Sequence, residues 1–352
     1  MQNVKRLLLY GGLSKDQYRL VHSEAIKSNH DSMRVYAPIA CVAFCVLLVI
    51  GCITGGQASA NLSVYVGSCI AMGVISFGAQ ACKPTSSRLV SILMHLFMIV
   101  LYAFSLCLSI ANAQLPVVSS IVCLMLTPLL FVERPLGIML GTVITVAVNC
   151  LVSLWFKAPQ IATTDTWNLV AYGIVAMVAV VFVMRIKFQA LLQAHEIAYL
   201  STHDALTGLR NRNSYESNLD YYASAQAGPL VCVYADANGL HQLNNSKGHE
   251  AGDEMLRQIA HELLQCFEHQ HTYRVGGDEF VAFCQGESLE KTNQELECIR
   301  ERLLSKGYQV SFGTSQISKR PEGARGVKAL VRDAEKEMYL QKSAYYALAG
   351  AR

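Results

Sequence analysis

The chain divides into an apolar half and a half of mixed polarity. Residues 35–186 form a series of long apolar stretches, whereas residues 188–352 mix charged and apolar positions at helical and strand spacings. A helix needs roughly 20 apolar residues to cross a hydrocarbon core about 30 Å thick. Six stretches reach or approach that length, and they are residues 35–55, 62–82, 89–111, 116–132, 136–156 and 169–186. The pattern predicts an all-α transmembrane domain of six helices, although the fourth would not span if it only enters the bilayer and returns.

Basic residues indicate how these helices are oriented. Lysine and arginine are retained on the cytoplasmic side of a membrane. They are found at Lys5, Arg6, Lys15, Arg19, Lys27 and Arg34 before the first stretch, Lys83 and Arg88 after the second, Arg134 after the fourth, and Arg185 and Lys187 after the sixth. The intervening loops carry only Lys157. Both termini are therefore predicted to be cytoplasmic, and a net charge of +3 is too small to indicate a nucleic-acid partner.

Two polar segments flank the apolar stretches. Residues 1–34 are predicted to form a cytoplasmic amphipathic segment on the membrane surface, with its apolar side at Leu7, Leu8, Leu9, Tyr18 and Val21. At the other end, no proline or glycine separates the sixth stretch from residue 200, so one helix should continue through a linker at residues 187–200. A short dimer seam along that linker could comprise Phe188, Leu191, Leu192, Ile197 and Leu200.

Residues 201–352 are predicted to form a cytoplasmic α/β domain. Residues 230–235 make a compact apolar strand, and residues 249–267 carry apolar side chains at helical spacing. Residues 273–275 and 280–284 flank Gly276 and Gly277, as two strands of a hairpin would. Asn213 and Glu216 resemble a capping box that opens a helix through about Ala225. Further helices at 287–305 and 327–345 and a strand at 308–314 indicate an α+β sandwich.

Several other polar residues carry weaker signals. The twelve cysteines include no close CxxC pair, which argues for neither disulfides nor zinc. His95, Asn149 and Gln80 lie inside the apolar stretches, where burying a polar group is costly and often functional, but each could simply bond a neighbouring helix. His269 and His271 are better explained as solvated loop residues than as metal ligands.

Carboxylates at two strand ends carry the chemistry of the polar half. Asp236 stands where the first strand ends, and Asp278 and Glu279 follow the glycine pair of the hairpin. Carboxylates that converge from two strands offer the hard oxygen ligands that Mg²⁺ prefers, and Mg²⁺ can hold a triphosphate for attack at phosphorus. The alternative is that each acid is a solvated turn residue. The flanking residues favour the metal site.

Four motifs in matching order surround these acids. They are Asp204-Ala-Leu206-Thr207-Gly208-Leu209-Arg-Asn211-Arg212; Asp236-Ala-Asn238-Gly239-Leu240 with Asn244; Gly248-His249 with Gly252-Asp253; and Arg274-Val-Gly276-Gly277-Asp278-Glu279-Phe280. This series, over roughly residues 200–346, resembles GGDEF-domain diguanylate cyclases. The resemblance implies a fold similar to nucleotidyl cyclase and polymerase palm domains, in a protein of the bacterial cytoplasmic (inner) membrane.

The resemblance also implies a reaction. Two GTP molecules face each other across a homodimer of the GGDEF domain and the linker helix, and each 3′-hydroxyl attacks the α-phosphate of the other. The products are cyclic di-GMP and two pyrophosphates. By position, Asp236, the carbonyl of Ala237 and Asp278 would hold Mg²⁺, or alternatively Mn²⁺. Asp278 or Glu279 would help to deprotonate the hydroxyl, and the metal would offset charge on the phosphoryl oxygens.

Substrate contacts can be carried over in the same way. Asn238, Gly239, Leu240, Gly276 and Gly277 match the backbone positions that approach the phosphates. Asn244 and Asp253 match the residues that read guanine, and a carboxylate at Asp253 can accept from guanine N1 and N2 together, a donor pair that adenine lacks. As alternatives, Asp253 could be a first-turn helix acid and the phosphate-contacting Lys342 a solvated helix charge.

The chain departs from the family pattern at several positions. His241 stands where the family usually has a phosphate-stabilising lysine, Asn245 and Glu335 each replace an aspartate, and Tyr346 stands where many members have an arginine. A histidine is only partly charged near neutral pH, so His241 could slow the catalysis it takes part in without abolishing it. Residues 267–270 read Phe-Glu-His-Gln instead of Arg-x-x-Asp, which predicts no feedback inhibition through that site.

Two functions remain open on the sequence alone. The first is a membrane-anchored diguanylate cyclase whose apolar half senses a signal or localises the enzyme. The second is a catalytically degenerate GGDEF domain that binds GTP or regulates a partner, because the positive charge around the phosphates is thin. The intact metal and guanine positions favour the enzyme. The signal that the membrane half would sense is not encoded in a recognisable motif.

Overall fold

A computed structural model describes residues 2–54, 61–84, 86–224, 228–318 and 323–350. The chain forms two compact units, Met1–His195 and Glu196–Arg352. The first unit is helical, and the second combines helices with one sheet. The division falls within the segment 187–200 that the sequence assigns to a linker.

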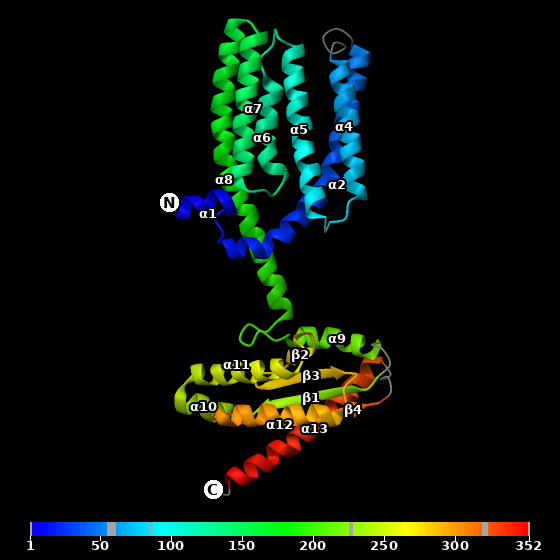
Figure 1. Ribbon diagram of the computed structural model, residues 1–352, viewed down its shortest axis with the longest axis vertical. Coiled ribbons are helices and arrows are strands. Elements are labelled where there is room, and N and C mark those ends of the chain that lie inside the picture. Colours follow the sequence, from blue (N-terminus) through cyan, green and yellow to red (C-terminus); the bar gives the residue numbers. More distant parts are fainter. Residues whose placement is uncertain (1, 55–60, 85, 225–227, 319–322, 351–352) are drawn as a thin grey trace. The chain divides into compact units, whose positions relative to one another are not determined.

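The helical unit contains seven helices among its described residues, and Figure 1 shows their arrangement. They are α1 (Gln2–Tyr10), α2 (Lys15–Thr54), α4 (Leu62–Ala81), α5 (Ser87–Ala111), α6 (Val118–Leu130), α7 (Pro135–Phe156) and α8 (Pro159–Thr202). The last of these continues without a break to Thr202, which confirms that one helix runs from the sixth apolar stretch through the linker. Figure 1 shows α6 between α5 and α7.

Five of these helices are long and apolar enough to cross a membrane, which indicates a multi-pass membrane protein. They are the helices that contain the first, second, third, fifth and sixth apolar stretches. The prediction of six spanning helices is not met, because α6 has only 13 residues. At 1.5 Å per residue α6 is about 20 Å long, roughly 10 Å shorter than the hydrocarbon core. The residues at 131–134 that follow it are not helical.

Buried polar side chains satisfy the backbone where α6 begins. The Asp165 carboxylate accepts a hydrogen bond from the Val117 amide at 2.9 Å and forms an ion pair with Lys157 at 2.8 Å. Lys157 also donates to the Leu115 carbonyl, and Ser153 donates to Asp165. Unpaired backbone groups are very costly in lipid, so this cluster lets a helix start inside the bundle. Lys157 therefore acts as a buried partner and is not simply a loop charge.

The other end of α6 is held in a similar way. Asn29 of α2 donates to the Val132 carbonyl and accepts from the Val132 amide, at 2.8 and 2.7 Å. Lys187 of α8 donates to the carbonyls of Leu129 and Phe131. The non-helical backbone after α6 is thus paired within the protein, which is the condition under which such backbone is tolerated at membrane depth.

The three polar residues noted in the apolar stretches each bond within the helical unit. Asn149 accepts from Ser120 at 2.7 Å and lies in the buried core. Gln80 exchanges two hydrogen bonds with Arg34 of α2. His95 bonds to the Ser91 carbonyl one turn earlier on α5 and is exposed. Asn149 and Gln80 thus join neighbouring helices, which agrees with the alternative that such polar residues simply bond a neighbouring helix.

The segment at residues 1–34 does not form one surface helix. It is divided between α1 and the first half of α2, and Ser14 and Gln17 form a reciprocal capping box at the start of α2. Tyr18 and Val21 are buried. Their cluster includes Phe188 of α8, so these two residues of the predicted apolar side pack within the unit, while Leu7, Leu8 and Leu9 are half-buried.

This packing also changes the predicted dimer seam. Phe188 is buried, and Leu191 and Leu192 pack against the same cluster. Ile197 and Leu200 are 69% and 47% exposed. Of the predicted seam, only Ile197 and Leu200 are therefore left exposed. The other three residues pack in a cluster that includes aromatic and apolar side chains of α2.

The second unit is a four-stranded sheet with helices on both faces. Its elements are α9 (Arg212–Ser224), β1 (Leu230–Ala237), α10 (Leu240–Lys247), α11 (His249–Cys266), η1 (His269–His271), β2 (Thr272–Arg274), β3 (Glu279–Gln285), α12 (Leu289–Ser305), β4 (Val310–Ile317) and α13 (Gly323–Gly350). The strand order is β2-β3-β1-β4, and every neighbouring pair is antiparallel. The predicted α+β arrangement and the hairpin are confirmed.

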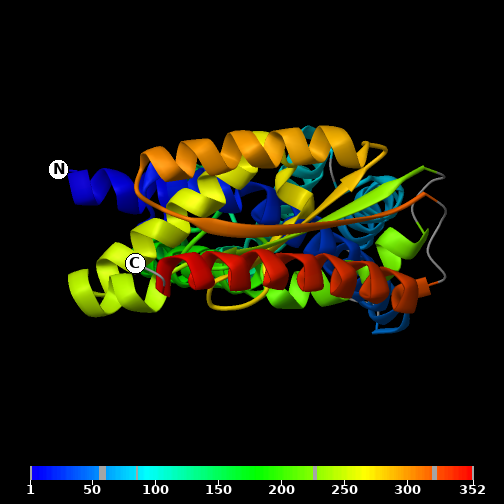
Figure 2. The same ribbon diagram turned by 90° about the horizontal axis from the view of Figure 1, so that it is seen from below.

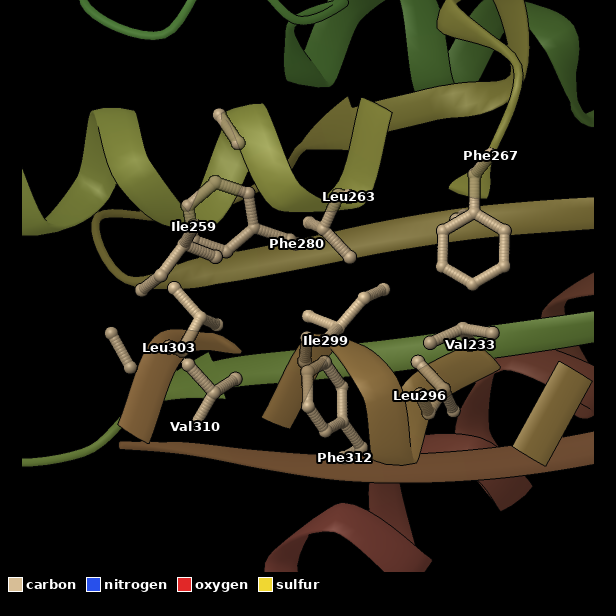
Figure 3. Packing of buried hydrophobic residues seen from close by; sticks show 14 of the residues in the cluster. Val233, Ile259, Leu263, Phe267, Phe280, Leu296, Ile299, Leu303, Val310 and Phe312 are labelled. Carbon is tan, nitrogen blue, oxygen red and sulfur yellow. The ribbon is translucent and has the colours of Figure 1, made fainter. Parts of the chain in front are cut away.

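Side-chain alternation along β1 assigns one helical layer to each face of the sheet. Val231, Val233 and Ala235 point to the side that α11 and α12 cover. Figure 3 shows Val233 among the residues of this core. Leu230, Cys232 and Tyr234 point to α9 and α13. Figure 2 shows α12 and α13 on opposite sides of β4. All eight residues of β1 are buried because both faces are covered.

The predicted elements differ from the structure in three details. The helix α9 starts at Arg212, and its capping side chain is Asn211, which accepts from the Ser214 amide at 3.0 Å. Asn213 therefore lies inside the helix and is not its cap, while Ala225 lies outside the described residues. Strand β1 continues through Ala237, so Asp236 is a strand residue. The separate helix α10 was not predicted, since only two of its eight residues, Leu240 and Leu243, are apolar.

Close packing of α13 on the sheet depends on Gly313 of β4. A Cβ added to Gly313 would collide with the Ala334 carbonyl oxygen and the Met338 amide nitrogen. Both are backbone atoms and cannot rotate away. The absence of a side chain at Gly313 therefore sets the distance between α13 and the sheet, and with it the position of residues further along α13.

Gly313→Ala is expected to push α13 away from β4. Overpacking against backbone should lower the free energy of unfolding by about 1–3 kcal/mol, measured by denaturant titration. Gly228→Ala is the matched control, because its added Cβ would meet only Gly286 Cα at 3.9 Å. Equal stability of the two variants would show that α13 is not fixed by this contact.

Candidate functional site

A carboxylate lies where β1 leaves the sheet. Asp236 is only 4% exposed, and by alternation its side chain falls on the α13 side. Ala334 and Met338 of α13 pack on that side, and Lys342 follows Met338 by one helical turn. The Nζ of Lys342 accordingly lies 2.6 Å from Oδ1 of Asp236.

The same row of α13 reaches the start of α10. Tyr346 is one turn beyond Lys342, and its hydroxyl accepts a hydrogen bond from the Gly239 amide at 3.2 Å. Gly239 immediately precedes α10, whose first amide groups have no partner within the helix. Lys342 and Tyr346 thus contact the two groups at the end of β1 that the sequence assigns to metal and phosphate.

The hairpin between β2 and β3 brings two further carboxylates to this edge. Glu279 is the strand partner of Asp236 in the β1–β3 pairing, and the Ala237 amide donates to the Asp278 carbonyl at 3.1 Å. Asp236, Ala237, Asp278 and Glu279 therefore lie together. The sequence predicted this meeting of two strand ends.

A second ion pair, which the sequence did not predict, holds the hairpin. Arg274 donates to Asp204 at 2.8 Å and to the Gly277 carbonyl at 2.6 Å. Asp204 also accepts from the amide and the hydroxyl of Thr207. Asp204 and Arg274 are 70 residues apart, and their presence in two of the motifs was the only signal that could have linked them.

The pKa values of the two aspartates, Asp204 and Asp236, are shifted in opposite directions. Burial alone would raise the pKa of Asp204, but hydrogen bonds from Thr207 and Arg274 lower it below its ordinary value. Burial raises the pKa of Asp236, and the nearby charges of Asp278 and Glu279 raise it further, which outweighs Lys342. Burial opposes the charge on Lys342, yet Asp236 and Asp278 raise the pKa of Lys342, so it stays a cation.

These groups fit a divalent metal ion. Three carboxylates and one ammonium group leave a formal charge of −2 at Asp236, Asp278, Glu279 and Lys342. Although Oδ1 of Asp236 is close to Lys342, it makes no well-aligned hydrogen bond and retains acceptor capacity. Carboxylate oxygens and a backbone carbonyl are the hard donors that Mg²⁺ takes. Asp236, the carbonyl of Ala237 and Asp278 could therefore hold Mg²⁺.

The other predicted phosphate contacts surround the start of α10. Asn238 is buried, its side chain accepts from Ser311 of β4 at 3.0 Å, and its amide donates to the Gln309 carbonyl at 2.9 Å. His241 is exposed and bonds to Asn245 at 3.2 Å. The structure thus turns His241 along the outer side of α10.

The predicted guanine-reading residues lie at the junction of α10 and α11. Oδ1 of Asn244 is buried without a hydrogen-bond partner. A Cβ on Gly252 would collide with that oxygen, so Gly252 leaves the space that the Asn244 amide fills. Asp253 is the next residue and is partly exposed. An unpaired buried amide oxygen is costly, which is consistent with a ligand that donates to it.

Comparisons with known proteins agree with this geometry. Residues 201–351 match the family described as "Diguanylate cyclase, GGDEF domain". These residues form a GGDEF domain. It is related to the diguanylate cyclase TpbB of Pseudomonas aeruginosa, which is 32% identical over 169 residues, covering 44% of this chain and 39% of TpbB.

The relatives do not share a single activity. The cyclic di-GMP phosphodiesterase PdeR of Escherichia coli is 29% identical over 155 residues, covering 41% of this chain and 23% of PdeR. The chain therefore spans less than half the length of these relatives. Among solved structures, the coiled coil and GGDEF domain of DgcB from Caulobacter crescentus, in complex with c-di-GMP, covers 44% of this chain and 88% of that one at 20% identity and a TM-score of 0.40.

Two histidines in the loop before the GGDEF signature form hydrogen bonds to other parts of the same domain. His269 bonds to the Gly208 carbonyl at 3.1 Å, and His271 bonds to the Tyr222 hydroxyl at 2.8 Å. Both histidines therefore have protein partners. Phe267 packs in the core beneath α11 (Figure 3), where the feedback-site pattern would require an arginine.

Asp236→Asn is expected to stabilise the GGDEF domain while removing its function. A carboxyl whose pKa is raised by folding is penalised when charged: the penalty is absent below its unfolded pKa, grows as the pH rises through its folded pKa, and is complete near neutral pH. The melting temperature of the variant, followed by circular dichroism, should exceed that of the unaltered protein at pH 7 and converge with it in acid.

The exposed acid Asp220 of α9 provides the control, because Asp220→Asn should leave the melting temperature unchanged. A lower melting temperature for Asp236→Asn at pH 7 would mean that the pair with Lys342 stabilises the fold more than the crowded carboxylates destabilise it.

Proposed function

We propose that the protein is a diguanylate cyclase, which condenses two GTP molecules into cyclic di-GMP and two pyrophosphates. One observation carries the proposal: Asp236, Asp278 and Glu279 come from two strands to one edge, beside Lys342 and the start of α10. This edge combines a surplus of hard negative donors with one cation and free amide groups. A triphosphate with a bound metal ion would complement these groups, because the ion is positive and the phosphate oxygens are negative.

Each group has a definite task in this proposal. Mg²⁺, when bound, would offset charge on the phosphoryl oxygens and align the triphosphate. Asp236, the Ala237 carbonyl and Asp278 hold the ion. Asp278 or Glu279 accepts the proton of the attacking 3′-hydroxyl.

The phosphates meet the start of α10 and the end of α13. The amides of Gly239 and Leu240 can donate to phosphate oxygens, as helix N-termini commonly do. For this, the Tyr346 hydroxyl must release the Gly239 amide, and Lys342 must exchange Asp236 for a phosphate oxygen. Asn244 and Asp253 read the guanine edge.

The membrane half completes the proposal. The reaction joins two nucleotides, so two copies of the GGDEF domain must meet, and the continuous helix α8 could bring them together. Clusters of Lys and Arg on alternate loops support cytoplasmic termini in a bacterial inner membrane. We further propose that the domain boundaries are residues 1–34, 35–186, 187–200 and 201–352.

A second function is favoured by the exposed His241. A GGDEF domain with so little positive charge around the phosphates could bind GTP without turning it over and act as a regulatory module. In that case Asn244 and Asp253 would still read guanine, while the 3′-hydroxyl would not react.

The decisive measurement is turnover of GTP by the full-length protein in lipid nanodiscs with Mg²⁺. We expect cyclic di-GMP and pyrophosphate in a ratio of one to two, and a fall of at least about 100-fold in Asp278→Ala, because the variant loses a metal ligand. Chromatography of the products and equilibrium binding of GTP are measured on the same samples.

Asp220→Asn serves here as the matched loss of an acid outside the site and should keep full activity. GTP binding without any cyclic product in the unaltered protein would support the regulatory module instead.

His241→Lys is expected to raise kcat by about tenfold or more. A lysine at this position would put a permanent positive charge on a flexible side chain beside the triphosphate, in place of an imidazole. Ser246→Lys adds the same charge on a different side of α10 and should leave kcat unchanged. Equal gains in both variants would indicate general electrostatic attraction of GTP, without a specific phosphate contact at position 241.

A further inference from the structure

Three cysteines of the helical unit converge between α2 and α4. Cys41 and Cys45 are four residues apart on α2 and therefore share one side of that helix. Cys69 of α4 faces them, with its Sγ 4.0 Å from that of Cys41 and 3.1 Å from that of Cys45. All three sulfur atoms lie within 4.8 Å of one another.

Within the described part of the chain, no other three His, Cys, Asp or Glu side chains have ligand atoms that all lie within 4.8 Å of one another. The spacing in the sequence did not reveal the group, because one of its members lies on a different helix. The donors are all sulfur, which selects soft, thiophilic ions over Mg²⁺ or Ca²⁺.

The separations suit a central ion with three sulfur ligands. A metal–sulfur bond of about 2.3 Å places three ligands of a trigonal centre roughly 4.0 Å apart. The separation of 4.0 Å between Cys41 and Cys69 matches that value, and the separation of 3.1 Å between Cys45 and Cys69 is shorter. Small rotations of the side chains would therefore equalise them. Cys45 is exposed on the surface of the helical unit, so an ion can enter without opening the packing between helices.

Charge narrows the choice of ion. These residues lie in helices with the composition of membrane spans, where an uncompensated charge is costly. Three thiolates leave a charge of −2 with a monovalent ion, −1 with a divalent ion and zero with a trivalent ion. We propose that Cys41, Cys45 and Cys69 form a three-thiol site for a trivalent thiophilic ion, with arsenic(III) as the ion it fits.

Binding of this ion is balanced without an oxidant or a reductant. Arsenous acid, As(OH)₃, is neutral, and its three As–O bonds are replaced by three As–S bonds. Each thiol proton leaves with one hydroxide as water, so three water molecules are released. Reactants and product are all uncharged, which suits a site that faces hydrocarbon.

The test uses the reduced full-length protein in lipid nanodiscs, titrated with arsenite. Native mass spectrometry should show one bound arsenic per chain and a mass gain of one arsenic less three hydrogens, together with a new near-ultraviolet sulfur-to-arsenic absorption. Cys41→Ser, Cys45→Ser and Cys69→Ser should each weaken binding at least about 100-fold, since even outer-shell partners of a metal change its affinity by roughly 10–100-fold.

Cys52→Ser is the matched control, because Cys52 is an exposed cysteine on the same helix outside the group, and it should bind like the unaltered chain. A second measurement needs no variant. Arsenite should protect the three cysteines from alkylation, mapped by peptide mass spectrometry, while Cys52 and Cys107 react at the same rate with or without it.

Four results would overturn the proposal. They are equal alkylation with and without arsenite, undiminished binding in any of the three variants, tighter binding of Zn²⁺ than of arsenite, and recovery of Cys45 and Cys69 as a disulfide from membranes quenched with an alkylating agent. None of these outcomes bears on GTP turnover, so this site and the proposed cyclase activity stand or fall separately.

Discussion

The buried carboxylate of Asp236 is the constraint on which the GGDEF domain depends. Because β1 lies inside the sheet and is covered on both faces, its last side chains must point either toward α11 and α12 or toward α13. Alternation places Asp236 on the α13 side, where a cation would offset the cost of burying its charge. Lys342 is that cation, and it arrives there because Gly313 lets α13 lie directly on β4. The packing of the core and the charge at the site therefore have one common cause.

The sequence predicts the meeting of acidic residues at this edge well because the signals for it are local. Asp236 follows an apolar strand, and Asp278 follows a glycine pair, so each strand end is visible within a few residues. The contacts that complete the edge are long-range. Lys342 was matched by family position, but its pairing with Asp236 and the bond between Tyr346 and Gly239 appear only once α13 is folded onto the sheet. The pairing of Asp204 with Arg274 was hidden for the same reason.

In the membrane half, too, features that depend on neighbouring residues can be predicted, whereas contacts between distant residues cannot. Hydropathy alone locates the five long helices, because each is a continuous apolar run. It does not reveal why the short helix α6 can end inside the bundle. That depends on Asp165 and Lys157 at one end and on Asn29 at the other, and the partners of Asn29 are 103 residues away. In the sequence, Lys157 looks like a loop charge and Asn29 like part of a polar leader.

In both halves, polar groups are buried where apolar side chains would be more stable. The free-energy cost of burying them is offset differently in each half. Around α6 each of these groups is matched by a partner inside the protein, so the arrangement is complete in itself. At the end of β1 the carboxylates exceed the cations, and Oδ1 of Asn244 has no partner. Burial, together with the charges of Asp278 and Glu279, raises the pKa of Asp236. Incomplete pairing leaves the site less stable than a fully paired one. A bound metal ion and a guanine nucleotide would supply the missing partners, so the deficit itself indicates where a ligand belongs.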